Sequence, residues 1–158
     1  MLGRWDIATD RLRPRGAYVI LGGLDRAGLR LAEELCRTVQ ARVVLIAGSA
    51  FPERGEWEGW IAERRPADPF TRQIRRLLEI ERAGGKAVVL RANLTGEPQL
   101  EAALDRAAAR LGRLNGIFHL AGPAPGIGPP ALERVLAGRD LDFCLYQDQE
   151  ITFQRPED

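Results

Sequence analysis

The stretch Ala17-Tyr18-Val19-Ile20-Leu21-Gly22-Gly23-Leu24-Asp25-Arg26-Ala27-Gly28 decides how this chain is expected to fold. Its first five residues are continuously apolar, which is typical of a strand that helices cover on both faces of a parallel sheet. The glycines that follow suit a tight turn, and residues 24–39 carry apolar side chains at helical spacing. The stretch therefore predicts a strand, a glycine turn and a helix in immediate succession.

This strand–turn–helix unit is where a Rossmann-type domain holds the pyrophosphate of a dinucleotide. Here Asp25 and Arg26 stand in the middle of the turn, where such turns need bare backbone. A side chain at position 26 takes up that volume, and Asp25 adds a charge that repels phosphate. Arg26 is alternatively a phosphate partner, although its bulk excludes more than it recruits. The turn thus indicates the fold, while its binding function is damaged.

Length and composition fit a single globular domain. The chain has 158 residues, of which 45% are hydrophobic and 28% charged, and its net charge is +1. This balance gives no sign of a nucleic-acid partner. Cys36 and Cys144 lie far apart and are expected to be buried apolar residues in a reducing compartment, so we predict neither a disulfide nor a metal site.

No targeting or membrane signal is evident. No apolar run approaches the roughly 18 residues that span a membrane, and residues 1–15 lack the apolar core of a signal peptide. We therefore expect a cytoplasmic protein with no membrane partner. We divide the chain into a lead-in segment, residues 1–15, and a single Rossmann-like domain, residues 16–158.

Strand and helix patterns alternate along the chain, which predicts a doubly wound parallel α/β sheet with right-handed crossovers. We expect about five strands in the order 3-2-1-4-5. Trp57 and Trp60 lie on one side of a short helix and are expected to pack, and residues 123–130 are expected to be loop. After the first strand and helix, the expected strands are 42–46, 86–91, 116–120 and 141–146, and the expected helices are 71–83, 95–111 and 131–136.

Six further segments carry a family resemblance: Arg11–Ile20, Phe51–Trp60, Asp68–Leu77, Ala92–Thr95, Gly116–Gly122 and Leu141–Tyr146. Together they resemble the N-terminal part of a short-chain dehydrogenase/reductase, and most closely the ketoreductase domain of modular polyketide synthases. The resemblance implies a Rossmann-like fold that is truncated relative to a full member of that superfamily. It also implies vestigial NADPH-contacting positions at Gly22, Gly23, Gly28, Gly48, Ser49, Asn93, Leu94, Ala121 and Gly122.

The cofactor positions depart from the family pattern. Leu21 replaces the threonine of the family's turn, and Arg26 replaces its second glycine. Gly48 stands where the family has an arginine that pairs with the 2′-phosphate of NADPH, so the bidentate donor is missing and Ser49 offers one weak hydrogen bond. Asn93 replaces the adenine-side aspartate, which is a milder change.

The catalytic positions depart further. The family reduces ketones with a tyrosine acid, a lysine and a serine, and the resemblance places the serine near Asp148 or Gln149, neither of which is serine. After Glu150 there is neither tyrosine nor lysine, and a proline–glycine loop with about two helical turns replaces a long helix of the family. His119 matches a structural turn and Tyr146 is expected to pack. We therefore predict no catalytic residue in this chain.

These losses predict a non-catalytic, ketoreductase-like domain with a structural or docking role in a polyketide synthase-type megasynthase. Its expected partners are neighbouring domains or another protein, with a carrier-protein-bound substrate as a further candidate. We expect no cofactor, or NADPH if the site is not fully lost. Two alternatives stay open: a fragment of an active NADPH-dependent β-ketoacyl ketoreductase domain acting on carrier-protein-bound intermediates, and a Rossmann module that binds another nucleotide.

Overall fold

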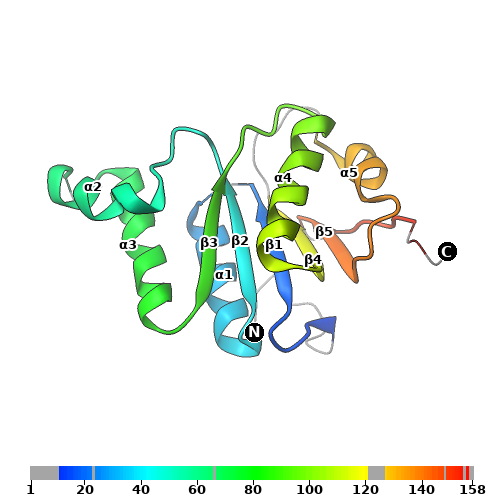
Figure 1. Cartoon of the computed structure of the whole chain (residues 1–158), viewed down its shortest axis with the longest axis horizontal. Coiled ribbons are helices and arrows are strands. Elements are labelled where there is room, and N and C mark those ends of the chain that lie inside the picture. Colours follow the sequence, from blue (N-terminus) through cyan, green and yellow to red (C-terminus); the bar gives the residue numbers. More distant parts are fainter. Residues whose placement is uncertain are drawn as a thin grey trace.

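Continuous apolar runs form the centre of one six-stranded sheet with the order β3-β2-β1-β4-β5-β6. The structure is a computed structural model that describes residues 11–22, 24–65, 67–120, 127–147, 149–154 and 156. Strands β1 to β5 pair in parallel, which confirms the predicted order 3-2-1-4-5 (Figure 1). The strands are β1 (Ala17–Leu21), β2 (Arg42–Ala47), β3 (Lys86–Arg91), β4 (Gly116–His119), β5 (Phe143–Tyr146) and β6 (Gln149–Glu150).

Strand β6 is the one addition to the predicted sheet. It pairs antiparallel with β5, with Leu145 opposite Glu150. Ile151, directly after it, is buried, and Phe153 packs against the same apolar cluster. The outer edge of β5 is therefore covered by residues from the same chain.

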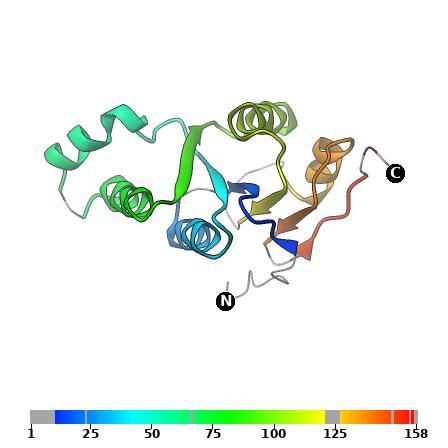
Figure 2. The same ribbon diagram turned by 60° about the horizontal axis from the view of Figure 1, so that its bottom comes forward.

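Helices cover both faces of the sheet, as the buried strands require. Helices α1 (Arg26–Val39) and α3 (Pro69–Arg82) lie on one face, and α4 (Glu97–Leu111) and α5 (Pro129–Leu136) lie on the other (Figure 2). Alternate residues of β1 show this division, because Ile20 packs with the α1 side and Val19 with the α4 side. Both faces of β1 are fully buried, so the chain is a doubly wound α/β domain.

Helix α5 begins earlier than predicted. Pro129 and Pro130 were expected in a loop, but they form its first turn. Proline is well tolerated there because the first helical residues need no N–H donor. Residues 123–126 of the expected loop lie outside the described residues.

The excursion after β2 packs onto the domain through its tryptophans. It contains a 3₁₀ turn, η3 (Arg54–Glu56), followed by α2 (Trp57–Glu63). The Trp57 side chain is buried, and its indole N–H donates to the Pro52 carbonyl at 3.0 Å. The Trp60 indole N–H donates to the carboxylate of Asp68 at 3.1 Å. The predicted packing role of both residues is confirmed.

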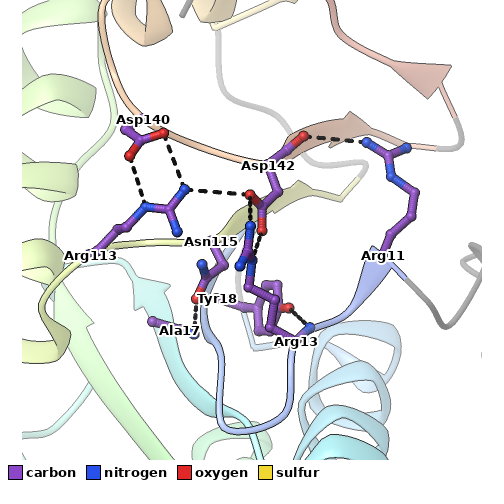
Figure 3. Close-up of polar contacts among 8 residues, drawn as sticks. All are labelled: Arg11, Arg13, Ala17, Tyr18, Arg113, Asn115, Asp140 and Asp142. Atoms are coloured by element: carbon purple, nitrogen blue, oxygen red, sulfur yellow. Dashed lines mark hydrogen bonds and ion pairs between the residues drawn. The ribbon is translucent and has the colours of Figure 1, made fainter. Parts of the chain in front are cut away.

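Residues 11–15 of the lead-in are bound to the end of the sheet where the strands begin (Figure 3). Leu12 belongs to the core, and the Arg13 backbone N–H donates to the Tyr18 hydroxyl at 2.7 Å. The Arg13 guanidinium also pairs with Asp142, just before β5, where its second hydrogen bond measures 2.8 Å. The Asp142 carboxylate also pairs with Arg113, just before β4, at a longer distance of 3.5 Å. One carboxylate therefore joins the lead-in to the segments that precede β4 and β5.

Both cysteines are free, as predicted. Burial raises the pKa of the Cys144 thiol to about 12, which keeps it neutral within the sheet. In the part of the chain that the structure describes, no helix is both long and apolar enough to cross a membrane.

Candidate cofactor site

The ends of β1, β2 and β4 meet at the point where the strand order reverses, since β1 has β2 on one side and β4 on the other. This is where ligands bind in open parallel sheets, beyond the carboxyl ends of the strands. The register of β1 and β4 sets Leu21 opposite His119. The sequence-predicted positions Gly22, Gly28, Gly48 and Asn93 all lie at or just beyond this edge.

Gly22 is held tightly against the end of β4. Its φ is +113°, and a Cβ atom there would lie 2.8 Å from the backbone oxygen of Leu120. The Leu120 N–H donates to the Leu21 carbonyl at 2.9 Å, which brings the two segments together. Glycine is therefore required at position 22 by packing and backbone geometry, whether or not a ligand binds.

Asp25 caps the helix that begins at the turn. Its backbone is extended, with φ −74° and ψ 179°, and its carboxylate accepts the Gly28 N–H at 2.8 Å. Aspartate is a favoured residue at this position because its oxygen satisfies an N–H that has no partner within the helix. The N-terminus of α1 thus carries a carboxylate of its own, where a ligand's phosphate would otherwise accept the same kind of hydrogen bond.

Arg26 is the first residue of α1 and is exposed. Its side chain lines a cavity that is shared with α3. The residue that occupies the helix N-terminus is therefore Asp25 rather than Arg26, a distinction that the sequence alone did not make.

Ser49, which follows β2, and Asn93, which follows β3, hydrogen-bond to each other at this edge of the sheet, on the side where the family resemblance would place the adenosine of a cofactor. The Ser49 N–H donates to the Asn93 side-chain oxygen at 3.2 Å, and the Asn93 amide donates to the Ser49 hydroxyl at 3.1 Å. A Cβ atom at Gly48 would meet only the Asn93 oxygen, at 3.9 Å. There is therefore open space beside position 48, and the side chains of Ser49 and Asn93 are hydrogen-bonded to each other.

Arg91 is a residue near this edge that the sequence analysis missed. It ends β3, pairs with the Glu53 carboxylate and donates to the Phe51 carbonyl at 3.4 Å. Its position two residues before Asn93 is the only signal in the sequence that places it here. Leu94, a further predicted position, is half-buried and packs against the core on the α4 side.

His119 is buried at the end of β4, with 2% of its surface exposed. Neither ring nitrogen has a hydrogen-bond partner among the residues that the structure describes. Burial lowers the pKa of His119, so the ring is neutral near pH 7. It lies against the Tyr146 ring, with 4.7 Å between the centroids. His119 therefore fills the core beside the site.

Tyr146 and the chain's one lysine lie at opposite edges of the sheet. Tyr146 ends β5 at the carboxyl edge, whereas Tyr18 lies in β1 and accepts from Arg13 at the opposite edge. Lys86, the only lysine, begins β3 and so also lies at that opposite edge. The described residues include no group of acidic, histidine or cysteine side chains that could hold a metal. Predicted positions Gly23, Ala121, Gly122 and Asp148 lie outside the described residues, as does the side chain of Gln149.

Comparison with known proteins agrees with this architecture. The profile of the KR domain family matches residues 16–125. The chain is 32% identical over 111 residues to 5-methyl-1-naphthoate synthase of Streptomyces sahachiroi, covering 70% of this chain and 6% of that protein. It is 25% identical over 157 residues to polyketide synthase PksM of Bacillus subtilis (strain 168), covering 87% of this chain and 3% of that protein. It thus spans a small part of these relatives.

The crystal structure of a ketoreductase domain from the bacillaene assembly line is also similar. It matches with a TM-score of 0.52 and 25% identity, over 70% of this chain and 22% of that one. The likeness to this structure agrees with the Rossmann-like fold, and the family match covers β1 to β4 with the helices between them. The chain belongs to the KR, or ketoreductase, domain family.

Proposed function

We propose that this chain is a non-catalytic, ketoreductase-like domain with a structural or docking role in a polyketide synthase-type megasynthase. The contact between Asp25 and Gly28 carries the proposal. A dinucleotide pyrophosphate needs the N–H groups and the positive end of the first helix. Asp25 takes up one of those N–H groups and adds negative charge at the same end of α1.

The adenosine side supports the same conclusion. NADPH carries a 2′-phosphate, which proteins usually hold with a bidentate arginine. Position 48 is glycine, and the nearby Arg91 is engaged by Glu53. The described residues therefore do not fit NADPH, and we derive no reaction step through it.

The position of Tyr146 relative to Lys86 supports the absence of catalysis. A tyrosine that donates a proton to a ketone is assisted by a nearby lysine that lowers its pKa. Tyr146 lies at the carboxyl edge, on β5, and Lys86 lies at the amino edge, on β3. No rearrangement of side chains alone can bring them into contact.

A structural role is supported by how firmly the lead-in is fixed. Asp142 binds Arg13 and Arg113 together (Figure 3), and Arg11 pairs with Glu150 of β6. A domain that precedes residue 11 would thereby be held at the amino edge of the sheet near β5. Since the relatives are many times longer than this chain, we propose that neighbouring megasynthase domains are its partners.

One observation favours the alternative that this chain is part of an active NADPH-dependent ketoreductase. Gly22 keeps the close approach of β1 to β4, and Ser49 and Asn93 remain together at the adenosine side. In that case the acid and the lysine would come from chain beyond these residues, and Asp25 would have to release the Gly28 N–H.

A reductase assay tests the proposal. The purified chain is incubated with NADPH and a small β-keto thioester, and NADPH absorbance is followed. The ketoreductase domain of the bacillaene assembly line serves as the reference. The proposal predicts no loss of NADPH above the rate without protein. Consumption that rises with protein concentration and requires the thioester would contradict it, because the catalytic groups would then have to lie within these residues.

A further inference from the structure

A cavity of about 530 Å³ lies between the start of α1 and α3, on the outer side of the glycine turn. Small-molecule sites commonly measure about 300 to 1,000 Å³, so the cavity has the size of a ligand site. It is separate from the sheet edge where Gly22 backs onto Leu120, because its walls are the residues after Gly22 together with α3.

The walls of this cavity carry an excess of positive charge. Four arginines line it, against the two carboxylates of Asp25 and Glu79. Three of these arginines form no ion pair or side-chain hydrogen bond within the described part of the chain. The fourth, Arg76, pairs with Glu33 at 3.6 Å. The three unpaired arginines are Arg26, Arg72 and Arg75.

The cavity also has an apolar wall and unsatisfied polar atoms. Leu24 and Leu29 are buried beneath it, and Pro69 borders it at the start of α3. Arg76 Nε and Gln73 Oε1 are buried atoms without a hydrogen-bond partner among the described residues, and such atoms usually have one. Guanidinium groups bind phosphate through paired hydrogen bonds. The lining thus combines phosphate donors with an apolar contact.

Side chains, not helix ends, would provide the recognition. Both helices begin here with an aspartate cap, because Asp25 accepts from Gly28 at 2.8 Å and Asp68 accepts from the Thr71 N–H at 3.0 Å. One backbone donor in the first turn of each helix, that of Gly28 in α1 and that of Thr71 in α3, is therefore already engaged. A ligand in the cavity would bind to the arginines.

We propose that the α1–α3 cavity binds an organic phosphate. Arg26 and Arg72 hold the phosphate group, and the apolar part of the ligand lies against Leu29 and Pro69. The site requires neither a dinucleotide bound in the glycine turn nor catalysis. Its test is therefore independent of the proposed structural role. It also gives Arg26 a role that does not place its side chain inside the turn.

Titration followed by NMR tests this site with phenyl phosphate, a phosphate ester with an apolar ring. We expect amide shifts at Leu29 and Gln73, with little change at Gly22 and Ser49. The double variant Arg26→Ala/Arg72→Ala should weaken binding by about tenfold or more, as expected for the loss of charge-assisted hydrogen bonds. The matched control is Arg30→Ala/Arg82→Ala, which removes two exposed arginines from the same helices outside the cavity; it should change the affinity less than about twofold.

Three results would overturn the proposal. Equal losses in both double variants would show only general attraction to positive charge. Shifts centred on Gly22 and Ser49 would place the ligand in the glycine turn. A glutamate-rich peptide that binds the cavity more tightly than phenyl phosphate would assign the cavity to an acidic protein segment.

Discussion

The Asp25 carboxylate accepts the backbone N–H of Gly28 at 2.8 Å, so the helix that begins at the glycine turn is capped by its own chain. In a dinucleotide site the same helix end faces a phosphate. The cap replaces an interaction with a ligand by an interaction within the fold. This explains why a turn that kept Gly22 and Gly28 acquired an aspartate between them.

Removing this cap should destabilise the domain. Asp25→Ala leaves the Gly28 N–H without its acceptor and should lower the free energy of unfolding by about 1 kcal/mol, the usual effect of losing a helix cap. Asp25→Asn keeps an acceptor oxygen and should retain most of the stability. Urea denaturation of both variants measures the effect. An equal loss in the two would show that the charge of Asp25, and not its hydrogen bond, stabilises α1.

Gly22 should tolerate no side chain. Gly22→Ala combines a φ of +113° with a Cβ atom 2.8 Å from the Leu120 oxygen, and we expect a loss of about 2 kcal/mol or more in unfolding free energy. Gly84→Ala is the matched control, since Gly84 has φ +90° but no atom within 4 Å of the added Cβ. It should lose only about 1 kcal/mol, the dihedral contribution alone. Equal losses would mean that the approach to Leu120 does not constrain this position.

Much of the fold follows from local sequence patterns. The apolar runs at Ala17–Leu21 and Arg42–Ala47 form strands because both their faces are buried, and the helical spacing after the glycine turn gives α1. Strand β6 could not be predicted in this way. It has two residues, too few to show a period, and forms because Leu145 offers Glu150 a backbone partner.

The site was less predictable than the fold. The glycine turn identified Gly22, and the family resemblance identified Gly48 and Asn93, as neighbours of a cofactor edge at which strand ends converge. Neither showed that Asp25 bonds to Gly28 or that Asn93 bonds to Ser49. Those contacts depend on side-chain directions, which only the folded backbone sets. The Arg13–Asp142 pair is a similar case, because 129 residues separate its members.

Asp142 should control whether the lead-in stays bound. Asp142→Ala removes the acceptor that joins Arg13 to Arg113, so trypsin should cleave after Arg11 faster than in the unmodified chain; the bond after Arg13 is resistant because Pro14 follows it. The pair is partly exposed, so global stability should change little. Mass spectrometry of timed digests identifies the cleavage.

Asp140→Ala is the control for this prediction. Asp140 binds Arg113 at 3.0 Å, whereas the Arg13 guanidinium pairs with Asp142, so the loss of Asp140 should leave the lead-in protected. Equal cleavage in both variants would show that Arg113, rather than the Arg13–Asp142 pair, holds the lead-in.

His119 should make the domain less stable in mild acid. Burial lowers the pKa of His119 in the folded state below its ordinary value of 6.5. Below that pH the unfolded chain binds a proton that the folded chain binds less well, so stability is lost as the pH falls. His119→Gln removes this titration and should show a smaller drop in unfolding free energy between about pH 7.5 and about pH 5.5. Urea denaturation at both pH values measures it, and an equal drop in both proteins would argue against a neutral buried His119.

The central claim, that the glycine turn no longer binds a dinucleotide, is tested most directly by isothermal titration calorimetry with NADPH. The unmodified chain should bind NADPH with a dissociation constant no lower than about 1 mM, which corresponds to about −4 kcal/mol, and any such binding should be lost in Arg26→Ala/Arg72→Ala, which removes the phosphate donors of the α1–α3 cavity. Asp25→Gly/Arg26→Gly/Gly48→Arg, which frees the helix end and supplies an arginine, should bind at least about tenfold more tightly. Binding of NADPH to the unmodified chain at micromolar concentration would contradict the claim.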